Sequence, residues 1–168
     1  QSDQYSADPE GGMFFMRIEF DLDGLAGRLS ELERDFAPIA ERFRMEWRFY
    51  LASVKKRVAV FVSKEDHCLL ELLWQWQSGD LYADIAAVVS NHPDLRRLVE
   101  PFGIPYVHIP VTPDTKPEAE RRQLEAVRRY GADLIVLARY MQIVSPSFIE
   151  GYRNRIINIH HSFLPAFV

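Results

Sequence analysis

The apolar positions of this 168-residue chain repeat with two different rhythms. Apolar and polar residues alternate over 14–20 and over 45–49, a spacing of two that predicts half-buried strands. Between these segments, apolar residues recur at helical spacing over 29–43, and Pro38 is expected to kink or restart this helix. A glycine-containing turn ahead of the first strand predicts a hairpin with an earlier strand over 2–6. Together these elements predict part of a small α+β domain.

Continuous apolar runs replace this alternation in the remainder of the chain. Such runs are typical of strands that are covered on both faces of a sheet, and they alternate here with segments of helical spacing. Gly79, Gly103 and Gly131 are placed to end three helices, and Ser145 followed by Pro146 is expected to begin a fourth. These alternations predict an α/β fold with a doubly wound, mostly parallel sheet. The expected strands are 58–63, 82–90, 104–110, 133–138 and 156–159.

The change of rhythm sets the expected domain boundaries. Residues 1–51 form the first domain, 52–57 a short charged link, and 58–168 the second and larger domain. The first domain is small for one that folds independently, because a chain of about 50 residues buries only a small core.

Composition narrows the classes of function that the chain can serve. A net charge of −4 argues against a broad basic face for nucleic acid or an acidic membrane. No run approaches the roughly 18 apolar residues of a membrane helix, and the polar N-terminus has no signal-peptide pattern. The single cysteine, Cys68, forbids an internal disulfide and fits a reducing cytosol. A cytoplasmic location is therefore expected.

In an open α/β sheet, ligands bind beyond the carboxyl ends of the strands, and this chain carries polar residues at several of these ends. The first expected strand runs into 63–68, Ser-Lys-Glu-Asp-His-Cys. This turn lacks the glycines that would let backbone N–H groups approach a phosphate, and Glu65 and Asp66 place two carboxylates there. The turn is either structural or lines a pocket. The candidate pocket-lining residues are Lys64, Asp66, His67 and, after a later strand, His108.

The segment 139–145 follows the fourth expected strand and carries apolar, aromatic and amide side chains on a non-helical backbone. Such a loop can hold a flat heterocycle, with backbone groups on the ring nitrogens and Tyr140, Met141 and Ile143 against the ring faces. The same pattern fits a loop that only plugs the end of the sheet. The pattern alone leaves both interpretations open.

The last expected strand ends in the sequence Asn158-Ile-His-His161. Because side chains alternate along a strand, Asn158 and His160 point to one face and His161 to the other. An amide beside an imidazole at this edge suits a carbonyl reaction, since the amide N–H stabilises a developing oxyanion and the imidazole handles a proton. A hydrogen-bonded structural asparagine and a capping histidine are the alternative.

Several stretches of the chain resemble a known family. The stretch 158–165, Asn-Ile-His-His-Ser-Phe-Leu-Pro, is similar to the Asn-Ile-His-x-Ser-Leu-Leu-Pro signature of the folate-dependent formyltransferase fold, and 136–149 resembles that family's folate-binding loop. Within the family, 58–81 resembles the formyltetrahydrofolate deformylase branch, as do the strand patterns upstream. In that branch an N-terminal ACT domain, a ferredoxin-like α+β fold, precedes the catalytic domain. The resemblance therefore implies a partial ACT domain over 1–51.

The resemblance implies hydrolysis of 10-formyltetrahydrofolate to formate and tetrahydrofolate, which supplies formate and balances one-carbon pools for purine synthesis. Asn158 would bind the formyl oxygen, and His160 would stabilise its charge and handle protons as the amine leaves. The family's third catalytic residue is an Asp downstream of this motif, and a complete ACT domain has a further strand and helix at its start. The resemblance therefore implies that the chain is cut at both ends and inactive alone. The pterin-pocket residues that the resemblance implies are Tyr140, Met141, Gln142, Ile143 and Val144.

Further expectations and alternatives accompany this interpretation. Folate and water are the expected partners, with no cofactor, metal, nucleic acid or membrane; an amino-acid effector at the ACT domain and a homo-oligomer are implied by the resemblance. A transferase to an amine such as glycinamide ribonucleotide is the first alternative, which the glycine-free turn at 63–68 disfavours. An amino-acid-binding regulatory module is the second. A zinc hydrolase using His108, His160 and His161 is disfavoured, because alternation separates the last two.

Overall fold

The computed structural model describes residues 2–6 and 14–159. The chain divides into two compact units, 1–53 and 54–168. In the described part of the chain, no helix is long and apolar enough to cross a membrane.

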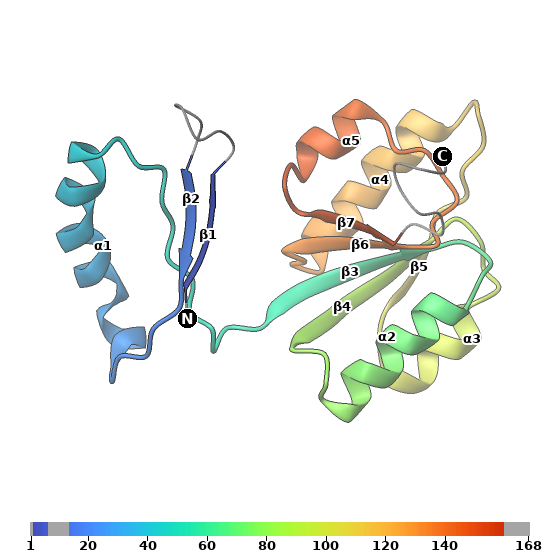
Figure 1. Ribbon diagram of the computed structural model, residues 1–168. Helices are drawn as coiled ribbons and strands as arrows, with labels where there is room; N and C mark the ends of the chain where they lie inside the picture. The colour runs from blue at the N-terminus through green and yellow to red at the C-terminus, as the bar shows by residue number, and fades with distance from the viewer. Residues whose placement is uncertain (1, 7–13, 160–168) are drawn as a thin grey trace. The chain divides into compact units, whose positions relative to one another are not determined.

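The first unit contains a two-stranded antiparallel sheet and one long helix (Figure 1). Strand β1 (Ser2–Ser6) pairs with β2 (Phe14–Ile18), which confirms the predicted hairpin. The side chains of β2 are all exposed, so the expected half-buried strand is wrong, because a two-stranded hairpin has little neighbouring structure to cover it. Helix α1 (Leu25–Arg42) contains Pro38 and continues past it, so the helix does not restart there.

Residues 45–49 form no strand, contrary to the sequence prediction. Their aromatic side chains pack around Phe36 of α1 instead. The ring centroid of Phe36 lies 5.2 Å from that of Trp47 and 5.5 Å from that of Phe49, both in edge-to-face geometry. The alternation of apolar residues here reflects aromatic packing against a helix and not pairing in a sheet.

The second unit is built on a five-stranded sheet with the order β5-β4-β3-β6-β7. All neighbouring strands pair in parallel, which confirms the predicted doubly wound α/β sheet. Its elements are β3 (Lys56–Val62), α2 (His67–Ser78), β4 (Ala83–Ser90), α3 (Arg96–Val99), η1 (Glu100–Phe102), β5 (Tyr106–His108), α4 (Lys116–Arg129), β6 (Leu134–Ala138), α5 (Pro146–Gly151) and β7 (Ile156–Ile159).

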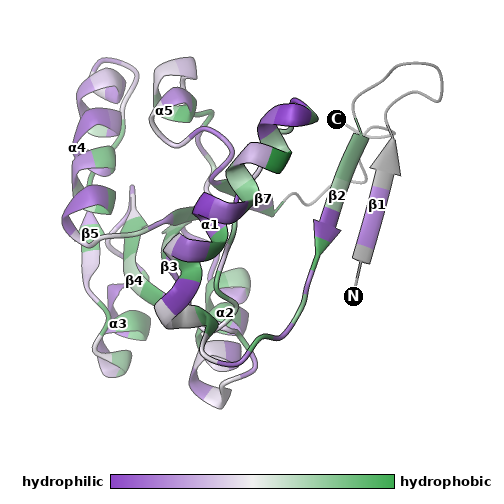
Figure 2. Cartoon of the chain, turned by 90° about the vertical axis from the view of Figure 1, so that its left-hand side faces the viewer, coloured by the Kyte–Doolittle hydropathy of each residue, from purple (hydrophilic) through white to green (hydrophobic). Residues whose placement is uncertain are grey.

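Helices cover both faces of this sheet (Figure 1). Helices α2 and α3 pack on one face, and α4 and α5 pack on the other. The side chains of β3 alternate between the two cores: Val58, Val60 and Val62 face α2, whereas Ala59 and Phe61 face α4 and α5. The central strands are therefore apolar at successive positions, as the hydropathy colouring of β4 shows (Figure 2).

The ends of the helices follow the predicted signals. Gly79, Gly103 and Gly131 have φ angles of 86°, 69° and 63°, in the left-handed region that glycine adopts at the end of a helix. At the start of α5, the Oγ of Ser145 accepts a hydrogen bond from the backbone N–H of Phe148 at 3.2 Å. This N-cap was predicted and is confirmed.

Two boundaries differ from the prediction. Strand β3 begins at Lys56, inside the expected link 52–57, because its parallel ladder with β4 begins at the pair of Lys56 and Ala83. Hydrogen bonds also join Arg57 to Asp133, which precedes β6. The backbone N–H of Arg57 donates to Asp133 Oδ2 at 3.0 Å, and the N–H of Asp133 donates to Arg57 O at 2.7 Å. The helix that Gly103 was expected to end changes to a 3-10 helix at η1, where Pro101 has no N–H to donate.

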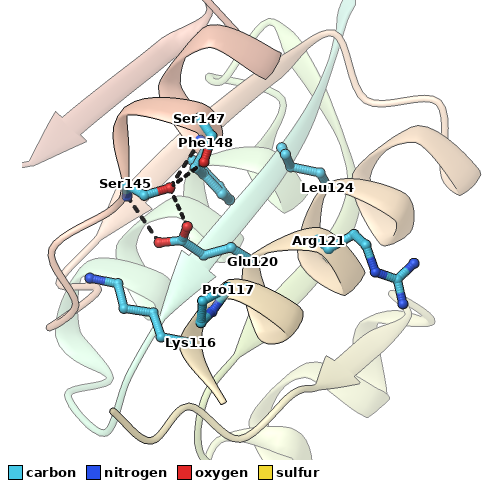
Figure 3. A pocket seen from close by; sticks show the side chains of 8 residues that line it. All are labelled: Lys116, Pro117, Glu120, Arg121, Leu124, Ser145, Ser147 and Phe148. Atoms are coloured by element: carbon cyan, nitrogen blue, oxygen red, sulfur yellow. Dashed lines mark hydrogen bonds between the residues drawn. The ribbon is translucent and has the colours of Figure 1, made fainter. Parts of the chain in front are cut away.

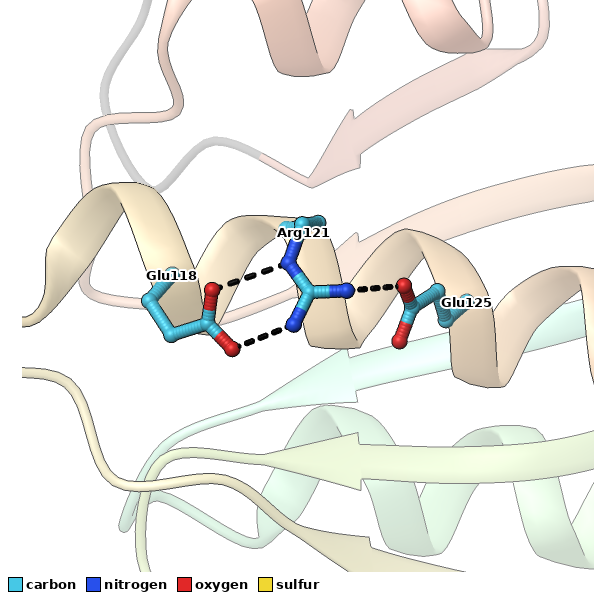
Figure 4. Close-up of polar contacts among 3 residues, drawn as sticks. All are labelled: Glu118, Arg121 and Glu125. Carbon is cyan, nitrogen blue, oxygen red and sulfur yellow. Dashed lines mark hydrogen bonds and ion pairs between the residues drawn. The ribbon is translucent and has the colours of Figure 1, made fainter.

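The outer face of α4 is charged. Arg121 forms ion pairs with Glu118 and Glu125, which lie three and four residues away on the same helix (Figure 4). The hydrogen bond from Arg121 lowers the pKa of the Glu118 carboxyl group. Exposed pairs of this kind contribute little to stability. Helix α4 is therefore held mainly by its buried face, which includes Ala119 and Val127.

We expect Phe61→Ala to lower the free energy of unfolding by about 3–5 kcal/mol. Phe61 is 0% exposed, and its ring centroid lies 5.4 Å from that of Tyr140 and 5.8 Å from that of Phe148. Urea denaturation followed by circular dichroism measures this loss. Trp74→Ala is the control, because that ring is 68% exposed. A loss no larger than that of the control would contradict the assignment of Phe61 to the core.

Candidate active site

The candidate site lies where the strand order of the second unit reverses. From β3 the chain moves to β4 and β5 on one side, and it then returns to β6 and β7 on the other. Strands β3 and β6 pair in parallel as far as Phe61 and Leu137. The segments that follow them leave the same edge of the sheet toward helices on opposite faces (Figure 1). Open α/β sheets bind ligands at this place, because the two departing segments leave a crevice.

A buried serine joins three strands at this edge. Ser63 directly follows β3, is 3% exposed, and donates a hydrogen bond from Oγ to Asn91 Oδ1 at 2.8 Å. The same Oγ accepts a hydrogen bond from the backbone N–H of Met141 at 2.9 Å. Because Asn91 follows β4 and Met141 lies shortly after β6, one hydroxyl group connects the ends of the three central strands.

The turn after β4 is held by its own hydrogen bonds. The backbone N–H of His92 donates to Ser90 Oγ at 3.1 Å, and the hydroxyl of Tyr106 donates to His92 O at 2.7 Å. Burial raises the pKa of the Tyr106 hydroxyl above its ordinary value. This turn is therefore a fixed support beside the crevice.

Helix α4 holds both ends of the loop 139–145. At the first end, Gln123 Nε2 donates a hydrogen bond to the hydroxyl of Tyr140 at 2.7 Å. At the second end, the carboxylate of Glu120 accepts hydrogen bonds from the backbone N–H of Ser145, at 2.9 Å, and from its Oγ (Figure 3). Gln123 and Glu120 are both buried and lie about one helical turn apart. The serine after β3 holds the loop at a third point.

The tip of this loop is open. Met141 is 57% exposed and Ile143 is 86% exposed, whereas Gln142 and Val144 are partly buried. A loop with anchored ends and apolar residues at its tip presents a surface on which a flat heterocycle can pack. These four residues were candidates for the pterin pocket, and their role there stays a prediction.

Tyr140, the fifth candidate, differs from the other four because its side chain lies in the core. Its ring is 8% exposed and packs edge-to-face on Phe61. Burial raises the pKa of its hydroxyl to about 12, the hydrogen bond from Gln123 opposes this shift, and the nearby Glu120 carboxylate adds to it. The side chain packs beneath the loop and is buried there. Tyr140 can therefore contact a ligand only through its backbone groups.

Arg139 turns the chain out of β6 with a φ of 59°, in the left-handed region. Its Nε is buried, with no hydrogen-bond partner among the residues that the structure describes. A residue other than glycine costs on the order of 1 kcal/mol in this conformation. The anchors of the loop must offset this cost, as is common for strained residues at functional sites.

Asn158 lies on β7, beside Leu137 of β6. Ile156, two residues earlier on β7, packs against the core under α4 and α5, so alternation places Asn158 on the same face. The side chain of Asn158 is exposed. His160 and His161 lie outside the described residues, and the pairing of Asn158 with His160 stays a prediction.

The remaining pocket candidates lie on two other strand ends. Lys64, Asp66 and His67 are exposed on the turn between β3 and α2, and the Asp66 side chain forms no capping hydrogen bond to the helix that it precedes. His108 is partly buried at the end of β5. Their role in a pocket stays a prediction. Over 2–6 and 14–159, no group of three or more His, Cys, Asp and Glu residues could hold a metal ion.

A pocket of about 510 Å³ lies between α4 and α5 (Figure 3). The buried residues Glu120 and Phe148 and the partly buried Leu124 line it, together with Lys116 and Arg121. The Glu120 carboxylate already accepts the hydrogen bonds that cap α5. The pocket therefore offers apolar surface and the ammonium group of Lys116, because Arg121 is paired with Glu118 and Glu125 and the Glu120 carboxylate is in structural use.

Sequence reasoning missed Asn91, Glu120 and Gln123. Asn91 directly follows a long apolar run, so its position at the end of a strand could have been predicted from the sequence. Gln123 lies between Ala119 and Ala126 at helical spacing, which marks a polar residue on the buried face of α4. A buried polar residue needs a partner, and this signal could have pointed to the loop. For Glu120 the sequence carries no comparable signal.

Comparison with known proteins adds independent information. A sequence model of the formyl transferase family matches residues 56–168. The chain is 55% identical over 168 residues to formyltetrahydrofolate deformylase of Bacillus subtilis, covering 100% of this chain and 56% of that protein. The chain therefore spans about half the length of the relatives that it matches.

Solved structures give the same result. The structure is similar to formyltetrahydrofolate deformylase of Burkholderia mallei, with a TM-score of 0.88 and 44% identity over 98% of this chain and 58% of that one. A glycinamide ribonucleotide transformylase from Symbiobacterium toebii has a TM-score of 0.61 and 30% identity over 72% of this chain and 58% of that one. The resemblance to the folate-dependent formyltransferase fold and its deformylase branch is thereby confirmed.

The pKa of Tyr140 predicts how stability changes at alkaline pH. Its folded value of about 12 lies above the ordinary value of 10. The folded protein therefore holds this proton more tightly than the unfolded chain, and the associated stability is present below pH 10 and is lost as the pH rises through 12. Between about pH 9 and 11 the loss is about 1 kcal/mol.

Tyr140→Phe should remove this contribution, so its free energy of unfolding should fall less than that of the parent between those two pH values. Urea denaturation at both pH values measures the difference. Tyr82→Phe, which removes the hydroxyl of a residue that is 57% exposed, is the control. Equal pH dependence in parent and Tyr140→Phe would contradict the raised pKa.

Proposed function

The chain belongs to the formyl transferase family, and on this premise we propose that the complete protein hydrolyses 10-formyltetrahydrofolate to formate and tetrahydrofolate. The observation that carries the proposal is an unequal likeness to two kinds of relative. Proteins named formyltetrahydrofolate deformylase match 100% and 98% of the chain at 55% and 44% identity. The glycinamide ribonucleotide transformylase matches 72% of it at 30% identity.

The turn between β3 and α2 supports a hydrolase over a transferase. A transferase to glycinamide ribonucleotide must hold a phosphate, and glycines would let backbone N–H groups reach it. The segment 63–68 has no glycine, and Glu65 and Asp66 are exposed there. Two carboxylates repel a phosphate, so water is the acceptor that this turn favours.

The proposed reaction needs a polarised carbonyl and an attacking water. The water oxygen bonds to the formyl carbon, and the amide of Asn158 stabilises the oxyanion that forms. The bond from carbon to N10 then breaks, and N10 takes up a proton, for which His160 is the proposed donor. An Asp downstream of His160 is proposed to position the water, to accept the proton that the water loses and to relay it, so that the proton given to N10 is replaced on His160.

The loop 139–145 is the proposed pterin-binding element. Its backbone groups would read the ring nitrogens, and Met141 and Ile143 would pack on the ring. The exposure of both side chains at the tip of an anchored loop supports this role.

Residues 1–51 are proposed to be part of an ACT domain and 58–168 part of the catalytic domain, joined by 52–57, whose last two residues begin β3. The hairpin and helix of the first unit support this proposal. An amino-acid effector, a homo-oligomer, a cytoplasmic location and a role in one-carbon supply for purine synthesis belong to the same proposal. Calorimetric titration with methionine or glycine tests the effector.

The choice of acceptor tests the proposed function on the complete protein. With 10-formyltetrahydrofolate in water, formate and tetrahydrofolate should appear in equal amounts. Added glycinamide ribonucleotide should neither accelerate this release nor become formylated. Transfer of the formyl group to that amine without release of formate would replace the hydrolase by the transferase.

We expect Asn158→Ala to lower kcat by roughly 10²–10³-fold, the usual cost of losing one oxyanion donor. Asn158→Asp is the matched variant, because it keeps the size of the side chain while its carboxylate repels the oxyanion. Both should lose activity while keeping the thermal unfolding midpoint of the parent. Turnover by Asn158→Ala within a few-fold of the parent would remove Asn158 from the reaction.

A further inference from the structure

We infer that Ser63 is a positioning residue for the folate substrate: its hydroxyl fixes the Met141 peptide and thereby the conformation of the loop 139–145. This inference rests on the proposed function, because it assigns a determinant of affinity to the loop that is proposed to bind the pterin. Ser63 itself need not touch the ligand.

The hydrogen bonds of Ser63 leave its hydroxyl no alternative orientation. The single proton of the hydroxyl is donated to Asn91 Oδ1 at 2.8 Å, which fixes the direction of the remaining lone pairs. One of them accepts the N–H of Met141 at 2.9 Å. Asn91 therefore orients the hydroxyl, and the hydroxyl orients the peptide. Both side chains are buried, so water competes poorly for these positions.

Met141 is the residue at which a constraint has most effect on the loop. The chain turns at Arg139 through a left-handed conformation, and the exposed apolar tip begins at Met141. The α4 anchors act on the side chain of Tyr140 and on Ser145, beyond the tip. Between these anchors, the Ser63 hydroxyl is the protein group that is seen to hold a backbone N–H of the tip in the described structure.

The contact contributes little to the sheet itself. The pairing of β3 with β6 ends at Phe61 and Leu137, and Ser63 and Met141 lie two and four residues beyond that pair. The two cores on either side of β3 are filled by other side chains. Loss of this hydroxyl should therefore alter the loop more than it alters the fold.

The test compares Ser63→Ala with Ser90→Ala in the complete protein. Ser90 is also buried, but its Oγ accepts the N–H of His92 in the turn after β4, and its longer contact with Ser63, at 3.5 Å, is to the backbone oxygen and not to the hydroxyl. Ser63→Ala should raise KM for 10-formyltetrahydrofolate about tenfold, since a buried group left without its partner costs that much or more, and should change kcat little. Ser90→Ala should lower the unfolding midpoint and leave KM near that of the parent.

A second pair of variants keeps the test decisive if Ser63→Ala does not fold. Ser63→Thr and Ser63→Val introduce two side chains of nearly the same shape as each other. Only Ser63→Thr retains a hydroxyl group. KM should be lower in Ser63→Thr than in Ser63→Val by about the same tenfold factor. Equal KM values for this pair, or equal effects of Ser63→Ala and Ser90→Ala on KM, would overturn the inference.

The assay of the parent separates this inference from the proposed function. If the parent protein does not hydrolyse 10-formyltetrahydrofolate, the proposed function fails, and with it the premise of this inference. If the parent hydrolyses the substrate and Ser63→Ala lowers kcat with KM unchanged, the proposed function stands and the positioning role of Ser63 is wrong.

Discussion

The parallel pairing of β3 with β6 is the contact on which the candidate site depends. Its register is set by the ladder itself, and Arg57 and Asp133 exchange hydrogen bonds just before the ladder begins. A slip of one residue would exchange the faces of every side chain on the strand. The two segments that form the crevice therefore leave the sheet from defined positions, although they lie 78 residues apart in the chain.

Helix α4 serves both the core and the site with one face. Ala119 and Val127 bury it against the sheet, while Glu120 and Gln123 on the buried side reach the loop 139–145. Buried polar groups destabilise a core unless they are paired. Part of this destabilisation remains at Gln123, because its Oε1 has no hydrogen-bond partner in the described structure. If α4 only covered the sheet, an apolar residue at position 123 would make the protein more stable. The amide of Gln123 is instead explained by the hydrogen bond that it donates to Tyr140 of the loop.

The sequence predicted the elements of the second unit more fully than those of the first, where the hairpin and the helix were found and the strand over 45–49 was not. Buried parallel strands and glycine-terminated helices carry strong local signals, and Gly79 and Ser145 lie where they were expected. At 45–49 the same alternation arose from aromatic packing on Phe36, which periodicity cannot separate from strand pairing. In the site, the polar residues of the loop were readable. The hydrogen bond from Met141 N–H to Ser63 Oγ could not be predicted, because it depends on strand order, a property of the whole sheet.

An anchored loop with an exposed apolar tip is a suitable element for binding a flat ligand. Ordering a flexible loop costs free energy at the moment of binding, and a preformed loop avoids that cost. Here the cost is met during folding by the hydrogen bonds to Tyr140, Met141 and Ser145, which also stabilise the left-handed turn at Arg139. Because these anchors lie beneath the tip, they leave its outer surface free. Residues buried behind the loop can therefore set its affinity, which is why the determinants of binding need not coincide with the ligand contacts.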